Sequence, residues 1–291
     1  MRVSTIPSGN GEKVVLRLLD KQVGRLELTK LGMDDRTYEM IIKIINQPHG
    51  ILLVTGPTGS GKTTTLYAAL QELNNNELNI STVEDPVEYF IDGINQTQIN
   101  NKVNMSFAKG LRAILRQDPD VVMLGEIRDS ETAQIAVQAS LTGHLVFSTL
   151  HTNTAVGAIS RLKDMGIEPF LLSSSLSAVL AQRLIRTLCA HCKESHLTSS
   201  KENEKLGIKN SVEIFSSNGC DHCNQTGYLG RTALYELLNI DESIKELIYN
   251  QASEAEILKS SSSHSTLSDQ AKTMVLKGDT SLFEAIRVVS L

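Results

Sequence analysis

Between residues 50 and 165 the chain alternates short apolar runs with segments in which apolar residues recur every three or four positions. Short apolar runs bounded by turns are typical of buried strands, and the wider spacing is typical of helices that lie on a sheet. The pattern predicts strands over 51–55, 80–83, 121–125 and 145–150, and helices over 64–73, 107–117 and 131–141. Such alternation predicts an α/β fold with a mostly parallel sheet covered by helices on both faces.

The flanking segments carry different patterns. Residues 2–19 predict two strands around a glycine-containing turn. Because a single hairpin is too small to be stable alone, we expect it to be the end of a truncated domain. Residues 31–46 and 173–186 predict further helices, and the chain from Asp241 onward is predicted to be helical, with a flexible serine linker at 260–263.

Composition narrows the class of protein. With 291 residues, of which 41% are apolar, the chain can form one large domain or two ordinary ones. A net charge of -5 and a pI near 5.8 argue against a general nucleic-acid-binding surface. The sequence has no apolar run of about 18 residues and no signal peptide, which predicts a cytoplasmic protein that does not span the membrane.

The first strand leads into a glycine-rich loop, Gly56-Pro57-Thr58-Gly59-Ser60-Gly61-Lys62-Thr63, which Thr64 follows. The loop fits the phosphate-binding pattern G-x-x-x-x-G-K-[ST], whose glycines let backbone N–H groups approach the phosphates. Lys62 is expected to reach the β- and γ-phosphates, and the Thr63 hydroxyl is expected to ligate Mg²⁺. The strand before the loop favours nucleoside triphosphate binding over a plain glycine turn with a solvated lysine.

Acidic residues follow two of the other predicted strands. Glu126 follows strand 121–125, the Walker B arrangement that places a carboxylate beside the metal and the attacking water. Glu84, Asp85 and Glu88 follow an earlier strand and are either a second functional acidic group or a solvated turn. Because the carboxyl ends of parallel strands share one edge, we expect both groups near the phosphate loop.

Histidine and arginine side chains extend the set of candidates. His144 and His151 stand at the two ends of strand 145–150, where each could be a packed, hydrogen-bonded side chain or a γ-phosphate sensor. Arg112 and Arg116 lie one helical turn apart and could face a groove, a neighbouring subunit or solvent. The residues alone leave these alternatives open.

The cysteines predict a second site. All four fall in two C-x-x-C pairs: Cys189 with Cys192, and Cys220 with Cys223. Two such pairs can complete one tetrahedral tetracysteine site, which suits a structural Zn²⁺, whereas redox activity would need only one pair. His191 and His222 lie inside the pairs and could replace a cysteine, but four thiolates already fill the coordination shell.

Taken together, these motifs resemble the secretion ATPase superfamily, and most closely its type II secretion members. The resemblance covers nearly the whole chain. It includes Arg2 to Pro7, the phosphate loop, Glu84-Asp85-Pro86, Leu124 to Asp129, Thr142-Gly143-His144, Leu150 to Asn153, and Gly227 to Arg231.

The resemblance implies a domain organisation around a RecA-like P-loop ATPase core. The implied parts are the end of a PAS-like N-terminal domain over 1–30, the RecA-like domain over 31–186, a tetracysteine zinc-binding subdomain over 187–235 and a C-terminal helical region over 236–291.

Residue roles are also implied by the resemblance. Glu126 would be the Walker B glutamate, and Glu84 would be the partner that polarises the attacking water. His144 and His151 would belong to a functional His box, with His151 as the candidate catalytic residue. Arg2 and Arg17, on the hairpin, would approach the γ-phosphate from the N-terminal domain in a ring that usually has six subunits.

The function implied is that of a cytoplasmic ATPase, peripheral to the bacterial inner membrane, that uses ATP and Mg²⁺ to power pseudopilus assembly in type II secretion. Recruitment would need the cytoplasmic domain of an inner-membrane partner and an N-terminal domain that this chain lacks; no nucleic acid is expected. Type IV pilus assembly ATPases share every motif and are the main alternative. A RecA-type DNA translocase and a zinc-held scaffold that binds nucleotide without hydrolysing it are less favoured.

Overall fold

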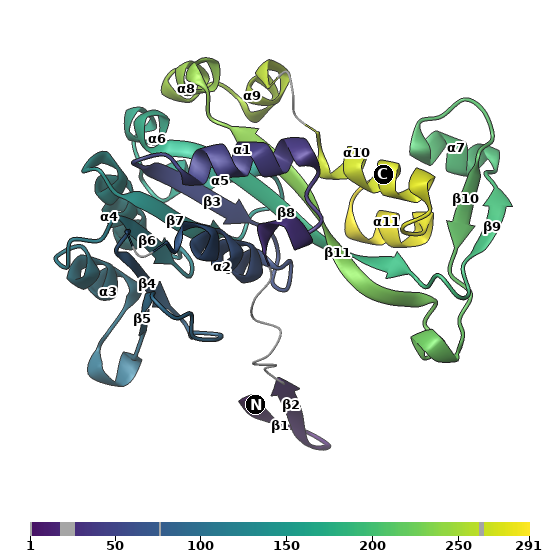
Figure 1. The fold of residues 1–291 in the computed structure, drawn as a ribbon, viewed down its shortest axis with the longest axis horizontal. Helices are drawn as coiled ribbons and strands as arrows, with labels where there is room; N and C mark the ends of the chain where they lie inside the picture. The colour runs from purple at the N-terminus through teal and green to yellow at the C-terminus, as the bar shows by residue number, and fades with distance from the viewer. Residues whose placement is uncertain (1, 18–26, 76, 262–264) are drawn as a thin grey trace.

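A seven-stranded sheet organises the protein in the computed structural model, which describes residues 2–17, 27–75, 77–261 and 265–291 (Figure 1). The strand order is β11-β8-β3-β7-β6-β4-β5, and every neighbouring pair is parallel except β11 with β8. The strands are β3 (Gly50–Thr55), β4 (Ile80–Glu84), β5 (Asn95–Gln98), β6 (Val121–Leu124), β7 (Leu145–Leu150), β8 (Leu176–Leu188) and β11 (Tyr228–Asn239). The predicted α/β fold with a mostly parallel sheet is confirmed.

Helices pack on both faces of this sheet. One face carries α1 (Asp35–Ile45) and α2 (Lys62–Leu73). The other carries α3 (Phe107–Ile114), α4 (Ser130–Leu141), α5 (Ala155–Asp164), α6 (Pro169–Ser175) and α8 (Glu242–Tyr249). Successive side chains of β3 alternate between the two cores, Leu52 toward α1 and α2 and Leu53 toward the opposite layer. Both faces are therefore buried, as expected for parallel strands.

The helix predicted over 173–186 is wrong. Helix α6 ends at Ser175, and the following residues form β8, which pairs with β3 on one side and β11 on the other. Its leucine, alanine and arginine residues favour a helix by intrinsic propensity. However, five consecutive residues, 178–182, are buried on the two faces of the sheet, so the strand shows no alternation of polar and apolar positions.

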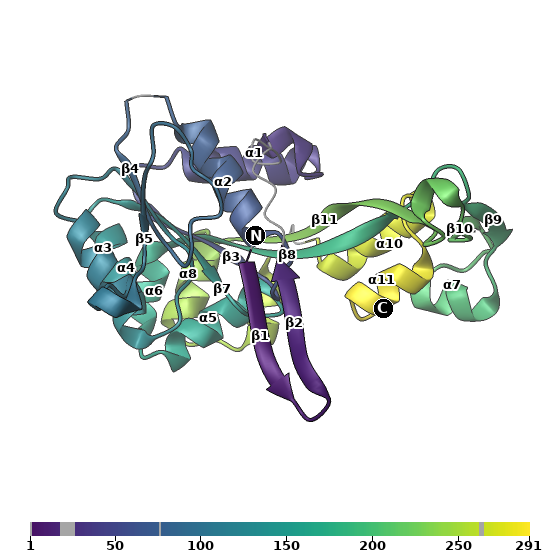
Figure 2. The same cartoon turned by 90° about the horizontal axis from the view of Figure 1, so that it is seen from below.

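Two strands join the sheet without having been predicted, β5 and β11. Because β11 comes from residues 228–239, the range predicted for the RecA-like domain, 31–186, omits one strand of its sheet. Strands β8 and β11 are long, and both extend beyond the sheet toward the C-terminal helices and the cysteine region (Figures 1 and 2).

The C-terminal region is helical, as predicted. It continues after α8 with α9 (Glu254–Ser260), α10 (Leu267–Lys277) and α11 (Leu282–Val288). Of the predicted serine linker, residues 262 and 263 lie outside the described residues. The cysteine region adds β9 (Glu194–Leu197), α7 (Ser200–Leu206) and β10 (Glu213–Ser216), and short 3₁₀ helices occur at Leu28–Lys30, Asn101–Val103 and Asp221–Cys223. No helix in the described part of the chain has the length and apolar character needed to cross a membrane.

The predicted N-terminal hairpin is confirmed. Strands β1 (Arg2–Ser8) and β2 (Gly11–Arg17) pair in antiparallel fashion and form a two-stranded sheet of their own. The pairing places Arg2 opposite Arg17. The side chains of these two arginines lie outside the described part of the structure.

Candidate nucleotide and metal sites

The carboxyl ends of β3, β4, β6 and β7 open onto one cleft of about 720 Å³. Because these strands are parallel, residues far apart in sequence meet at the same edge of the sheet. The lining includes Thr58 to Thr64, Glu84, Asp85, Glu88, Glu126, Arg128, His151, Leu184 and Arg231. The structure thus brings the phosphate loop, both acidic motifs and the second histidine together.

The phosphate loop presents backbone donors to this cleft. Gly59 and Gly61 adopt φ values of 80° and 89°, which side-chain-bearing residues rarely adopt. Helix α2 begins directly after Gly61, whose position offers no side-chain cap to the first N–H groups. The Ser60 hydroxyl is one of the few buried polar groups in the described residues that have no hydrogen-bond partner. This set of N–H and O–H donors at a helix N-terminus fits a phosphate group.

Lys62 is held inside the loop. Its Nζ donates to the carbonyl oxygens of Gly56 at 2.9 Å and Pro57 at 3.1 Å. Burial lowers the pKa of Lys62, the Glu126 carboxylate opposes that change, and Arg183 adds to it, with a net lowering. These two bonds use two of the three ammonium donors, so a phosphate can bind the third donor or take the place of a carbonyl.

Glu126 lies at the base of the cleft, two residues beyond the end of β6. Arg128 donates to its Oε1 at 2.5 Å, and the Nε2 of His151 lies 3.5 Å from its Oε2. Arg128 also lies 3.8 Å from Asp85. Burial raises the pKa of Glu126, but Arg128 and His151 outweigh burial and leave the pKa below its ordinary value. Glu126 is therefore an ionised carboxylate beside the phosphate loop.

Glu84 has a different environment although it also lines the cleft. Its Oε1 accepts hydrogen bonds from Thr82 at 2.6 Å and Gln96 at 3.1 Å, and its Oε2 accepts one from the hydroxyl of Tyr67. Burial raises the pKa of Glu84, and these hydrogen bonds only partly offset the rise. Both oxygens of Glu84 accept hydrogen bonds from the protein while its side chain lines the cleft, so the role in polarising water that the resemblance implied stays a prediction.

The sequence analysis identified His151, which lies against Glu126, but not Arg128 or Tyr67, which donate to Glu126 and Glu84. Arg128 could have been found, because it follows Glu126 by two residues. Tyr67 gave no such signal: it lies inside α2, and its hydroxyl accepts from the Glu88 N–H at 3.3 Å. Arg231 reaches the cleft only because β11 joins the sheet.

The two predicted histidines lie at opposite edges of the sheet. His144 precedes β7, and its Nδ1 lies 2.9 Å from the Ala139 carbonyl near the end of α4, so it is a packed side chain. Only His151 lines the cleft among the described histidines. Arg112 pairs with Glu131 at 2.7 Å, away from the cleft lining.

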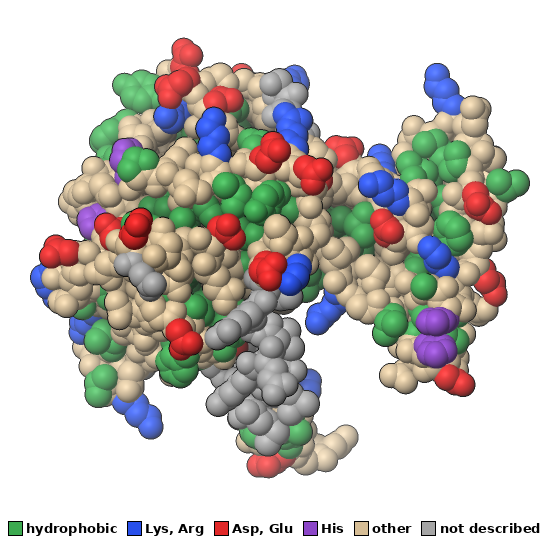
Figure 3. Space-filling view, in the orientation of Figure 1, with side chains coloured by type: hydrophobic (Ala, Val, Ile, Leu, Met, Phe, Trp, Pro, Cys, Tyr) green, Lys and Arg blue, Asp and Glu red, His purple; other side chains and the backbone are tan. Residues whose placement is uncertain are grey.

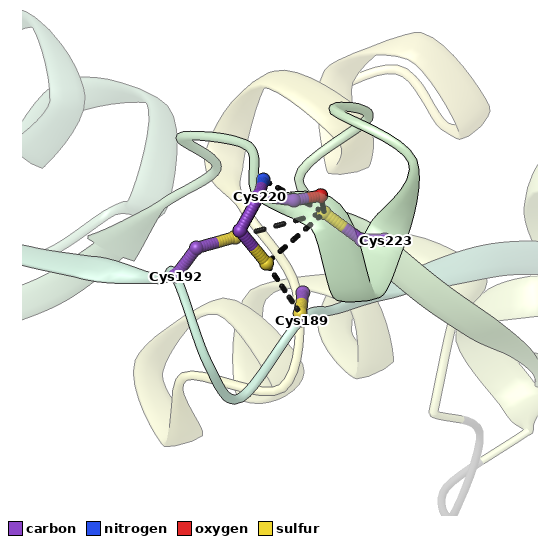
Figure 4. Close-up of side chains that lie close together, drawn as sticks. All are labelled: Cys189, Cys192, Cys220 and Cys223. Carbon is purple, nitrogen blue, oxygen red and sulfur yellow. Dashed lines mark hydrogen bonds between the residues drawn. The ribbon is translucent and has the colours of Figure 1, made fainter.

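The four predicted cysteines converge from two segments of chain (Figure 4). Their sulfur atoms all lie within 4.8 Å of one another, with Cys189 to Cys220 at 3.9 Å, Cys192 to Cys223 at 3.8 Å and Cys220 to Cys223 at 3.7 Å. A tetrahedral zinc site with Zn–S bonds of about 2.3 Å requires sulfur separations of about 3.8 Å. The arrangement therefore fits Zn²⁺.

Backbone donors and nearby histidines complete the surroundings of this site. The N–H groups of Cys220 and Gly227 point at the Cys223 sulfur, at 3.3 and 3.2 Å, as donors to a thiolate would. His191 and His222 stack on each other, with ring centroids 4.1 Å apart. The space-filling view shows a pair of adjacent histidine side chains on the surface, drawn in purple (Figure 3). Among the described residues the ligand group contains the four cysteines and neither histidine.

Comparison with known proteins places the chain in a family. The family model described as type II/IV secretion system protein matches residues 1–287. The chain belongs to this family. Among its relatives, type II secretion system protein E of Pseudomonas aeruginosa is 59% identical over 291 residues, and type II secretion system ATPase E of Vibrio cholerae is 59% identical over 292 residues. Each match covers 99% of this chain but only 58% of the relative, so the chain spans little more than half the length of these secretion proteins.

Solved structures of a pilus retraction motor and of another bacterial ATPase have the same fold. The pilus retraction motor PilT with bound ADP aligns over 99% of this chain and 73% of its own, with a TM-score of 0.70 and 29% identity. The Legionella pneumophila ATPase DotB aligns over 98% and 71%, with a TM-score of 0.71, and at 23% identity shows likeness of fold alone. With the clustered cysteines, these likenesses confirm the predicted fold class.

Proposed function

We propose that the protein hydrolyses ATP to ADP and phosphate in the cleft beside Lys62 and that this reaction powers pseudopilus assembly in type II secretion. The observation that carries the proposal is the meeting of a phosphate loop with an ionised carboxylate, Glu126, at one edge of the sheet. The identity to secretion ATPase E and the likeness to an ADP-bound motor support it.

Within the cleft, Lys62 and the loop N–H groups would bind the phosphates. Thr63, Glu126 and Asp85 supply the hard oxygen atoms that Mg²⁺ prefers, and bound Mg²⁺ would neutralise charge on the phosphates. Glu126 would accept a hydrogen bond from the attacking water and orient it. Arg128 and His151 would keep Glu126 ionised and in place.

The remaining implied residues keep their places in the proposal, and Glu84 would help to polarise the attacking water. Arg2 and Arg17 would approach the γ-phosphate from the hairpin of a neighbouring subunit in a hexameric ring. An arginine in this role contributes about 10³ to 10⁵ in rate in other phosphoryl-transfer enzymes. Zn²⁺ on the four cysteines would stabilise the region around β9 and β10 and take no part in hydrolysis.

The wider role extends beyond this chain. We propose a cytoplasmic ATPase on the inner face of the inner membrane, recruited by the cytoplasmic domain of a secretion partner. Relatives that are 54% to 59% identical bear type II secretion names, whereas the pilus motor is 29% identical, which favours secretion over a pilus system. Co-precipitation of the longer protein with the membrane partner of one system or the other would distinguish a secretion role from a pilus role.

Two substitutions test the reaction. Lys62→Ala removes the cation that binds the phosphates, and we expect loss of both ATP binding and turnover. Glu126→Gln keeps the shape of the side chain, and we expect ATP binding within about twofold but a kcat lower by about 10² to 10⁴. Calorimetry with Mg²⁺ and ATP measures binding, and phosphate release measures turnover.

His144→Gln is the matched control, because this histidine lies at the other end of β7 and should leave both quantities unchanged. Undiminished phosphate release by purified Glu126→Gln would refute the assignment of Glu126. If turnover of the unchanged protein is strictly linear in concentration through the assembly range, sites shared between subunits are excluded.

A further inference from the structure

The loop between β7 and α5, residues 151–154, contains His151, which lies against Glu126. Hydrogen bonds hold this loop at three points. The first is Thr55, the last residue of β3. Its hydroxyl accepts a hydrogen bond from the Thr152 N–H at 2.9 Å and lies 2.6 Å from the Thr152 hydroxyl. Since Thr55 directly precedes the phosphate loop, the two loops are tied together at their bases.

A second fastening comes from Arg183 of β8. Its Nη2 donates to the carbonyl oxygen of Asn153 at 2.9 Å and to the Asn153 side-chain oxygen at 3.1 Å, while Nη1 donates to the Gln182 carbonyl at 3.1 Å. A Cβ placed on Gly56 would lie 2.4 Å from that same carbonyl and 3.2 Å from Nη1. The guanidinium of Arg183 therefore lies next to Gly56, the first glycine of the phosphate loop, and at the same time donates hydrogen bonds to Asn153.

The third fastening is the buried carboxylate of Glu236 on β11, which is 5% exposed. Its Oε1 accepts from the N–H of Ala155, the first residue of α5, at 2.9 Å. Its Oε2 accepts from the N–H of Leu267, the first residue of α10, at 3.4 Å. An anion is favourable at a helix N-terminus, and here one carboxylate serves two helices. Through it the His151 loop and the C-terminal helices share an anchor.

We propose that Arg183 and Glu236 are positioning residues for hydrolysis. They hold loop 151–154 so that His151 stays against Glu126. Because Glu236 also binds the first N–H of α10, the position of this loop depends on how α10 packs. The inference rests on the function proposed above. Neither side chain is among the described residues that line the cleft, so both would act through the loop and not by touching substrate. Their loss should change the rate of the chemical step more than it changes nucleotide binding.

The test uses Arg183→Lys and Glu236→Gln in the whole chain. Lysine keeps the charge but lacks the planar fork that reaches Asn153 and Gln182 together. Glutamine keeps the shape but turns an NH₂ group toward one of the two backbone N–H groups. We expect kcat to fall by about 10- to 100-fold, since small misplacement near the reacting groups has effects of this size. KM and calorimetric ATP affinity should stay within about twofold.

Controls and a structural readout keep the outcomes apart. Arg36→Lys and Glu246→Gln, at exposed positions of α1 and α8, should change nothing. Hydrogen exchange should show faster exchange of the Thr152 and Ala155 amides in the two test variants. Unchanged kcat, or equal losses of kcat and ATP affinity, would overturn the inference. If the unchanged protein binds ATP but never hydrolyses it, the proposed function is wrong. Hydrogen exchange then tests the positioning role by itself: if the Thr152 and Ala155 amides stay protected in both variants, that role is overturned.

Discussion

In the nucleotide cleft the charged groups already bind protein partners: Lys62 binds loop carbonyls and Glu126 binds Arg128. In the cysteine site, by contrast, four sulfur atoms lie at the separation that one metal ion requires. Of the three donors on the Lys62 ammonium, the loop carbonyls use two, so a phosphate can be bound and released without unfolding the loop. The cysteines need only lose protons. The first arrangement suits a ligand that enters and leaves, and the second suits an ion that stays.

The two sites also differ in how the chain builds them. The cleft is assembled from the ends of four parallel strands and from β8 and β11 behind them, so it exists only when the sheet is complete. The cysteine site is built by two short turns, while Leu206 and Ile214 between them belong to the same core as Val275 and Leu282 of the C-terminal helices. Because an ion on the four sulfur atoms would join the two turns directly, metal binding should matter more to the stability of these turns than nucleotide binding matters to the sheet.

Removal of the metal should produce the largest effect and would sharpen this contrast. Cys220→Ser leaves three thiolates, and we expect loss of zinc. Structural zinc sites of this type supply an apparent folding free energy of about 10 to 16 kcal/mol. Metal analysis and hydrogen exchange should show an apo protein that is unprotected across 189–227, with calorimetric ATP affinity within about twofold of the unchanged chain.

His222→Ala is the control for that experiment, because the histidine neighbours the site without belonging to the ligand group. This variant should retain one zinc per chain. Full zinc content in Cys220→Ser, or zinc loss in His222→Ala, would contradict a site made of four thiolates. ATP affinity that falls together with zinc would show that the two sites are not independent.

Both sites could be predicted from sequence where their chemistry is local. The phosphate loop and the paired cysteines have fixed spacings, because backbone curvature and metal geometry restrict which residues can be neighbours. Four strands and three helices between residues 50 and 165 could be predicted for a similar reason, since each buries one or two regular apolar faces, whereas β5 and α5 were not predicted.

What could not be predicted depends on tertiary neighbours. Strand β8 lies between two other strands and is buried on both faces, so its pattern carries no strand period and its composition points to a helix. Glu84 and Glu126 have different partners, Tyr67 in one case and Arg128 in the other. Two acidic residues after two strands look alike in sequence, and only the tertiary structure shows which side chains each of them meets.

A buried ion pair between α11 and β8 gives a prediction of intermediate size. Glu284 of α11 is fully buried and accepts from Arg186 of β8 at 2.7 Å and from Arg287 at 2.5 Å. Burial raises the pKa of Glu284, but the two arginines outweigh burial and lower it to about 2. Glu284→Gln should destabilise the protein by about 2 kcal/mol at pH 7, because the charge that pairs with both arginines is lost.

The pH dependence fixes the sign of this effect. The pKa of Glu284 is lower in the folded state than in the unfolded chain, so its stabilisation is fully present above the unfolded value near 4.5 and is lost as pH falls toward about 2. Urea unfolding should show the difference between the two proteins shrinking over that range. Glu242→Gln, at an exposed position of α8, should show no such difference. A difference that stays constant down to pH 2 would contradict the ionic origin of the effect.

The smallest expected effect lies in the electrostatics of the cleft and should leave the cysteine site unchanged. Arg128→Gln removes the cation that lowers the pKa of Glu126, so the pKa rises and the acidic limb of the kcat profile moves to higher pH. A hydrogen bond to a charged group contributes about 1.5 kcal/mol, which corresponds to about a tenfold loss of kcat on that limb. Arg36→Gln should leave the profile in place, and zinc content should stay at one per chain in both variants. If the acidic limb of Arg128→Gln coincides with that of the unchanged protein, Arg128 does not control the pKa of Glu126.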